Sequence, residues 1–145
     1  MSLMINKVII NDRIARIRKL LLKLKQIRDL EEKDFEKDYD KQLIAERSLQ
    51  IVAQAILDIG NHIIAHHGWG KPESYRQIIT LLYQNNALSE GYQKELEGLA
   101  SLRNILVHDY LSLKPDILYK DISNGITAIE FFIKEIITKY GDNHE

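Results

Sequence analysis

The sequence predicts an all-α fold, a single-domain bundle of about five helices. Apolar residues recur at spacings of three and four along most of the 145-residue chain, which is the pattern of amphipathic helices. Only two prolines, Pro72 and Pro115, interrupt these stretches. No segment alternates apolar and polar residues for long enough to indicate a strand. The length matches one domain, expected over residues 4–145, and can bury an apolar core without disulfides.

Five segments carry the helical pattern. Ser89 is a candidate N-cap for the fourth segment, and Gly141 is a candidate C-terminal cap for the fifth. Short polar or glycine-containing connections separate the segments, which favours a bundle. The helices are expected over about 5–32, 40–66, 74–84, 89–109 and 116–140.

The composition excludes several classes of site. There is no cysteine, so disulfides, thiolate metal sites and cysteine nucleophiles are absent, and the composition suits a reducing, cytoplasmic location. Twenty basic and 21 acidic residues give a net charge of −1, so a nucleic-acid site must be a local patch. No membrane span or signal peptide is expected. The residues before Met4, Met1-Ser2-Leu3, are typical of an expression scar.

The first helical segment carries an uneven charge. Residues 7–28 contain eight basic side chains, among them Arg13 and Arg16, against one acid, Asp12. One interpretation is a basic helix that contacts phosphates. The other is a solvated helix face that precedes the acidic stretch over residues 29–40.

The second segment contains a row of polar residues at a spacing of four, which places them on one helix face. This row could line a cleft, face solvent or form a buried hydrogen-bonded seam. His62 and His66 also have the spacing of two metal ligands on a helix, but no third ligand is evident and no metal site is expected. The row consists of Glu46, Gln50, Gln54, Asp58, His62 and His66.

Side chains suited to phosphate chemistry gather near the end of the fourth segment. Arg103 offers a planar, permanent charge, and His108 can exchange a proton near neutral pH. Together they suffice for metal-free cleavage of RNA, although an ordinary surface ion pair of His108 with Asp109 fits the spacing too. Asn104 lies four residues before His108 and could orient its imidazole.

The helical geometry of this stretch favours a composite site. Arg103 and His108 lie about 140° apart around a straight helix, so they do not point at one spot within one chain. A second copy of the chain could supply the missing partner group across a two-fold axis. Tyr110 lies seven residues after Arg103 and therefore shares its face.

The order Arg103-Asn104, three residues, His108-Asp109-Tyr110 resembles the Arg-x4-His-x-Tyr motif of the HepT-like toxins, a branch of the HEPN superfamily. The resemblance extends over about residues 43–132. It is carried by residues 46–49 and 55–65, similar to the second helix of that family, by 72–75, similar to the lead into the third, and by 99–110, similar to the fourth.

The resemblance implies a homodimeric, metal-independent endoribonuclease toxin with its active site between protomers. Arg103 would stabilise the phosphate of the RNA substrate, His108 would act as general acid and base, and Asn104 would support them. The implied partner is a MntA-like minimal nucleotidyltransferase antitoxin that inhibits the toxin by transferring AMP from ATP to Tyr110. No cofactor is expected.

Two alternatives remain open at this point. The first is a catalytically silent HEPN module that acts as a dimeric adaptor for a minimal nucleotidyltransferase, with the Arg103 region as a docking surface. The second is a structural helical dimer without a ligand.

Overall fold

The computed structural model describes residues 5–108 and 114–141, and of His108 it describes the backbone only. These residues form helices and connecting segments, with no strand among them. The all-α prediction is therefore confirmed, but the described residues contain six helices instead of about five. They are α1 (Lys7–Arg28), α2 (Glu32–Lys37), α3 (Tyr39–His67), α4 (Tyr75–Gln84), α5 (Gln93–His108) and α6 (Pro115–Tyr140).

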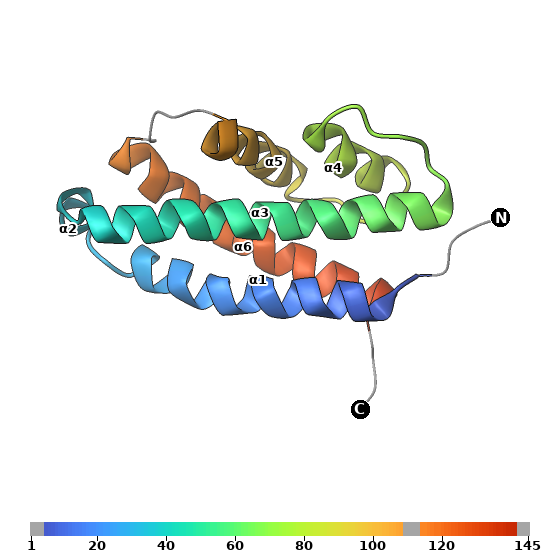
Figure 1. Cartoon of the computed structure of the whole chain (residues 1–145), viewed down its shortest axis with the longest axis horizontal. Coiled ribbons are helices and arrows are strands. Elements are labelled where there is room, and N and C mark those ends of the chain that lie inside the picture. The colour runs from blue at the N-terminus through green and yellow to red at the C-terminus, as the bar shows by residue number, and fades with distance from the viewer. Residues whose placement is uncertain (1–4, 109–113, 142–145) are drawn as a thin grey trace.

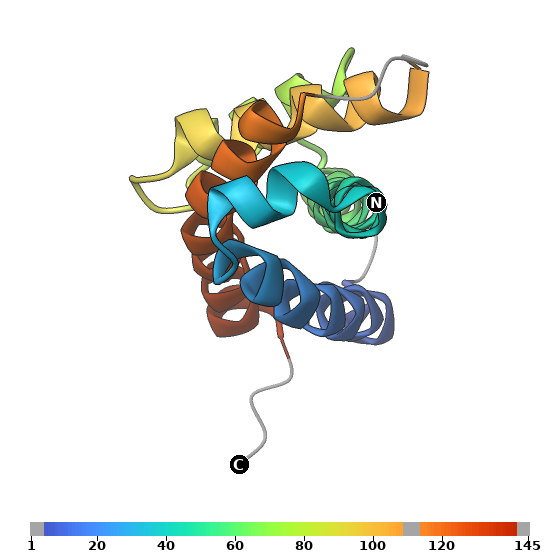
Figure 2. The same ribbon diagram turned by 90° about the vertical axis from the view of Figure 1, so that its left-hand side faces the viewer.

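Helix α3 runs through the middle of the bundle. The antiparallel helix α1 packs along one side of it, and α4 and α5 cover another side (Figure 1). The view along the bundle shows α6 beside α1 and below α5, so that it packs against both (Figure 2). This arrangement leaves a strip of α3 open between α1 and α5, and the candidate site lies on that strip.

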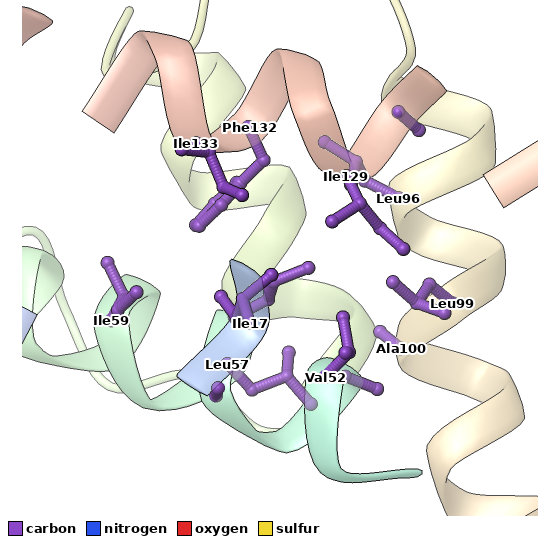
Figure 3. Packing of buried hydrophobic residues seen from close by; sticks show 14 of the residues in the cluster. Ile17, Val52, Leu57, Ile59, Leu96, Leu99, Ala100, Ile129, Phe132 and Ile133 are labelled. Carbon is purple, nitrogen blue, oxygen red and sulfur yellow. The ribbon is translucent and has the colours of Figure 1, made fainter. Parts of the chain in front are cut away.

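One apolar core receives side chains from all six helices. Ile17 of α1, Val52 of α3, Leu99 of α5 and Phe132 of α6 point into it from different directions (Figure 3). All four side chains are buried. The spacing of three and four that predicted the helices is thus the spacing of the residues that face this core.

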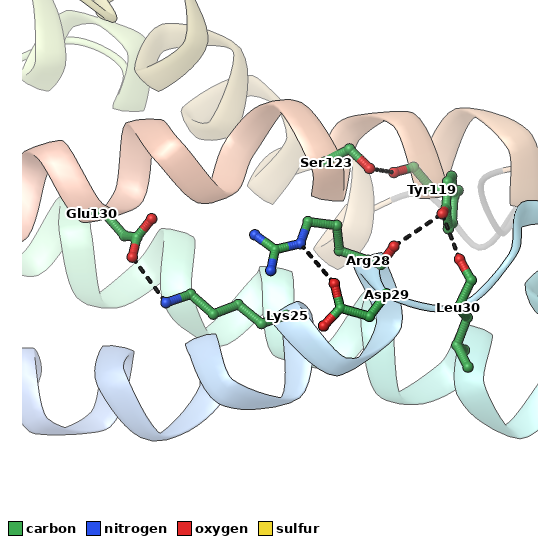
Figure 4. Close-up of polar contacts among 7 residues, drawn as sticks. All are labelled: Lys25, Arg28, Asp29, Leu30, Tyr119, Ser123 and Glu130. Atoms are coloured by element: carbon green, nitrogen blue, oxygen red, sulfur yellow. Dashed lines mark hydrogen bonds and ion pairs between the residues drawn. The ribbon is translucent and has the colours of Figure 1, made fainter.

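The sequence pattern misplaces the end of the first helix and misses α2. Helix α1 ends at Arg28 instead of continuing to about residue 32. The Tyr119 hydroxyl shares its one hydrogen between the carbonyl oxygens of Arg28 and Leu30, at 3.0 and 2.6 Å (Figure 4). The Arg28 carbonyl is one of those that a helix end leaves free. The short α2 follows because Phe35 is fully buried against the Tyr119 ring.

The expected start of the helix at Ser89 is also wrong. Helix α5 begins at Gln93, and the first bond of its ladder joins the Leu96 amide to the Tyr92 carbonyl. The Ser89 amide instead donates to a carboxylate oxygen of Glu135 at 2.6 Å, which ties the preceding loop to α6.

The expected cap at Gly141 is confirmed, because its N–H donates to the carbonyls of Ile136 and Ile137 at the end of α6. Its φ of −76° is open to any residue. The need for glycine comes from space, since a Cβ would lie 2.8 Å from the Cα of Ile137.

Helices α3 and α4 approach each other closely at Gly60. A Cβ on this residue would lie 2.7 Å from Cγ2 of Ile78 and 3.1 Å from Cδ1 of Leu82, well inside normal contact distance. Glycine therefore sets the spacing of α3 and α4, and with it the position of Tyr75 at the start of α4.

Within residues 5–108 and 114–141, no helix is both long and apolar enough to span a membrane.

Candidate functional site

Arg103 is held from two neighbouring helices. Its Nε donates a hydrogen bond of 2.7 Å to Oε1 of Gln54 on α3. Its Cζ lies 4.6 Å from the centre of the Tyr75 ring on α4, a distance at which the ring attracts the cation. The side chain is half-buried. The guanidinium is therefore oriented before any ligand binds.

Gln54 belongs to a chain of polar contacts that continues to α1. Its Nε2 donates to Oδ1 of Asp58 at 2.8 Å, and Oδ2 of Asp58 accepts from Nε of Arg13 at 3.3 Å. Arg13 also donates to Asp12 at 2.9 Å. The hydrogen bonds to Asp12 and Asp58 raise the pKa of Arg13 above its ordinary value. The chain fixes the orientation of the Gln54 amide, with its oxygen toward Arg103.

These residues line a hollow of about 190 Å³ formed by side chains of α1, α3 and α5. We call it the arginine hollow. Four of its lining side chains are arginines and one is a carboxylate, so it is strongly cationic although the whole chain has a net charge of −1. Its lining residues are Arg13, Arg16, Arg47, Gln50, Ile51, Gln54, Ala55, Asp58 and Arg103.

The local sequence explains how the hollow forms. Gln50, Gln54 and Asp58 are spaced by four on α3 and therefore face the same way. Arg13 and Arg16 are three apart on α1 and meet them from one side. For these residues the polar row of α3 lines a cleft, and the basic helix contributes charge to it.

The other end of the polar row has a different role. Nε2 of His62 accepts a 2.9 Å hydrogen bond from the backbone N–H of Asn6, just before α1. Burial and the neighbouring His66 lower the pKa of His62, which favours the neutral ring that this acceptor role requires. In the part of the chain that the structure describes, no group of three or more His, Asp or Glu residues could hold a metal ion.

Asn104 does not line the arginine hollow. Its exposed side chain borders a second hollow of about 460 Å³, which also contains Asn61, Tyr75 and Ile78. Tyr75 therefore lies beside both Arg103 and Asn104. The supporting role expected of Asn104 stays a prediction, since the imidazole that it would orient lies outside the described part.

The side chain of His108 and the whole of Tyr110 fall outside the described residues. The structure therefore brings Arg103 together with α1, α3 and α4, whereas the roles expected for His108 and Tyr110 stay predictions.

Three residues of this region lie in stretches that carry the family resemblance, but the sequence assigned none of them a role in the site. Arg47 lines the hollow, but a single arginine on a helix carries no signal. Nothing in the pattern separates Tyr75 from the other tyrosines. Gly60 interrupts a helical stretch, and an isolated glycine inside a helix is the one signal that points to a close packing contact.

Comparison with known proteins agrees with this architecture. The family model described as ribonuclease HepT-like matches residues 10–136. The chain is 34% identical over 131 residues to the mRNA nuclease HepT of Shewanella oneidensis, covering 90% of this chain and 97% of that protein. It is 30% identical over 132 residues to the tRNA nuclease HepT of Aphanizomenon flos-aquae, covering 91% and 90%.

A solved structure shows the same fold. It is a tri-AMPylated HEPN toxin of Shewanella oneidensis in complex with an MNT antitoxin. The match has a TM-score of 0.81 and 33% identity, and it covers 90% of this chain and 98% of the toxin chain. The family match and these likenesses together show that the chain belongs to the ribonuclease HepT-like family.

Proposed function

We propose that this protein is an endoribonuclease toxin whose active site combines Arg103 and His108 and requires no metal ion. The observation that carries the proposal is the position of Arg103, which is oriented by Gln54 and Tyr75 at the edge of the arginine hollow. A guanidinium matches the oxygens of a phosphodiester, and the surrounding positive charge attracts RNA. Relatives named as mRNA and tRNA nucleases support the same chemistry.

The proposed reaction uses the two side chains in different ways. His108 takes the proton of a 2′-hydroxyl, whose oxygen then attacks the adjacent phosphorus, and the bond from phosphorus to the 5′-oxygen breaks. The leaving 5′-oxygen receives a proton from a general acid. Arg103 stabilises the negative charge that develops on the phosphate oxygens.

A homodimer would complete this site. Arg103 and His108 lie about 140° apart around a straight helix, so a partner protomer is the natural source of the converging group. Ile105 and Val107, on the last turns of α5, are 42% and 37% exposed. Both residues lie within the motif, so an interface at this end of α5 would cover apolar surface as well as the site.

We further propose that a MntA-like nucleotidyltransferase inhibits the protein by attaching AMP to Tyr110. The solved relative is an AMPylated toxin in complex with an MNT antitoxin, which supports this partner. Each AMP unit adds a negatively charged phosphate close to the motif. Such groups would occupy the cationic surface and repel RNA.

Cleavage of RNA by the purified protein in EDTA tests the activity. We expect cleavage to persist in EDTA and to fall by about 10²–10⁴-fold in His108→Ala. His67→Ala is the matched control, because it removes an exposed imidazole at the far end of α3. Loss of activity in EDTA would contradict metal independence, and full activity of His108→Ala would contradict the mechanism.

Intact-mass measurement after co-expression with the nucleotidyltransferase tests the regulation. Added AMP units should appear on the wild-type chain and disappear in Tyr110→Phe. The adaptor alternative predicts a different pattern: binding to the nucleotidyltransferase, no RNA cleavage and no growth arrest when the chain is expressed alone.

A further inference from the structure

Two arginines of the arginine hollow form no hydrogen bond or ion pair with the described residues. Arg16 of α1 and Arg47 of α3 are exposed, and neither takes part in such an interaction within residues 5–108 and 114–141. Arg13 and Arg103 differ from them, because Asp58 and Gln54 already bind their Nε atoms.

The acceptors in the hollow cannot balance this charge. Asp58 is the carboxylate among the lining side chains, and both of its oxygens already accept hydrogen bonds, from Gln54 and Arg13. Arg16 and Arg47 therefore place two uncompensated charges in one hollow. Two positive charges without a described partner in one hollow favour the binding of an anion there.

We propose that Arg16 and Arg47 bind a backbone phosphate of RNA next to the linkage held by Arg103. The proposal rests on the function proposed above and adds a requirement on its substrate, namely at least one phosphate flanking the scissile linkage. The two arginines come from different helices and line the same hollow as Arg103. An RNA strand carries a phosphate at every nucleotide, so a strand held at Arg103 brings a neighbouring phosphate to the same hollow.

Binding of RNA that cannot be cleaved separates this proposal from catalysis. A fluorescent 2′-O-methyl oligoribonucleotide lacks the attacking hydroxyl, and its affinity is measured at several salt concentrations. We expect Arg16→Gln and Arg47→Gln each to weaken binding by roughly tenfold. The slope of log affinity against log salt should fall by about 0.7 for each phosphate that the variant no longer neutralises.

Arg18→Gln is the matched control. It removes the same charge from the same helix, but Arg18 borders the groove between α1 and α6 instead of the arginine hollow. Its effect on affinity should be less than about twofold. Equal affinities of the Arg16, Arg47 and Arg18 variants would overturn the proposal. A changed oligomeric state of the Arg16 or Arg47 variants on size-exclusion chromatography would overturn it too, by assigning these arginines to assembly.

A second measurement tests the flanking phosphate itself. Replacing the linkage next to the scissile one by a neutral methylphosphonate should weaken wild-type binding by roughly tenfold. It should have little further effect on the double variant Arg16→Gln, Arg47→Gln. An equal reduction in the affinity of both proteins would overturn the proposal. Failure of the wild-type protein to cleave ordinary RNA would instead contradict the proposed function. Binding and cleavage are measured separately, so the two failures can be told apart.

Discussion

The arginine hollow and the contact between α4 and α5 differ in how fully their charged side chains are paired. At the contact, Glu97 is only 13% exposed, and three side chains donate to it. Thr80 donates at 2.8 Å, Gln93 at 3.0 Å and Arg76 at 3.3 Å. Both carboxylate oxygens are thus bound internally. In the hollow, four arginines lie beside one carboxylate, and Arg16 and Arg47 have no described partner.

This difference separates stability from function. A saturated group such as Glu97 lowers the free energy of the folded chain, because three hydrogen bonds to its mostly buried carboxylate are lost when it is removed. An unsaturated cluster keeps its binding capacity for a ligand. Substitutions in the arginine hollow should therefore lower activity more than stability, and a substitution of Glu97 should lower stability more than activity.

Among the substitutions that compare these two regions, the largest effect is expected for Arg103→Ala. Loss of the guanidinium should lower kcat/KM for RNA cleavage by about 10²–10³-fold. The free energy of unfolding should change by less than about 1 kcal/mol, because water can replace it as donor to the half-buried Gln54. Cleavage assays and urea denaturation measure the two quantities. A large loss of stability would show that the hollow is a structural network, like the contact around Glu97.

Glu97→Ala should show the reverse profile. Three donors lose their acceptor, so the free energy of unfolding should fall by about 1–3 kcal/mol. The cleavage rate of the folded protein should stay within about twofold of wild type. Glu130→Ala is the control, since it removes an exposed carboxylate paired with Lys25 and should cost less than about 1 kcal/mol.

Acid should weaken the same contact. Burial opposes ionisation of Glu97, but hydrogen bonds from Gln93 and Thr80 and the charge of Arg76 outweigh it and lower its pKa below the ordinary value of 4.5. A carboxyl with a lowered folded-state pKa stabilises the protein above its unfolded-state pKa and loses this contribution as pH falls through the folded-state value. Stability should therefore decline below about pH 4.5, and less steeply in Glu97→Gln. Identical pH profiles would contradict this assignment.

The smallest effect is expected for Tyr75→Leu. Loss of the ring beneath Arg103 should cost about 0.5–1 kcal/mol of transition-state stabilisation, a two- to fivefold fall in kcat/KM. Tyr75→Phe keeps the ring and should match wild type. If Phe were as harmful as Leu, the hydroxyl and not the aromatic face would be the active feature.

Periodicity was sufficient to predict the long helices but not the short one. The expected segments 40–66 and 116–140 differ by a residue or less at each end from Tyr39–His67 and Pro115–Tyr140, because each carries many turns of the apolar pattern. Helix α2 buries one side chain, Phe35, and one residue defines no period. Ser89 does not cap α5, which begins at Gln93, and its amide instead binds Glu135, 46 residues away.

The candidate site was predictable only in part, for a related reason. The sequence motif singled out Arg103, and the spacing of four grouped Gln54 with Asp58, since both signals are local. Arg13 and Arg16 lie near these residues because α1 packs beside α3. Residues that are distant in the sequence but close in the fold produce no local sequence pattern. Arg47 was not predicted for the same reason, because only the fold places it in one hollow with three other arginines.

Gly60 shows how backbone spacing can govern electrostatics at a distance. A methyl group here would collide with the Ile78 side chain, so that side chain or the fourth helix as a whole would have to shift. Tyr75 begins that helix and faces the cation on the fifth. Any outward shift of the fourth helix would therefore weaken the attraction between this aromatic face and Arg103.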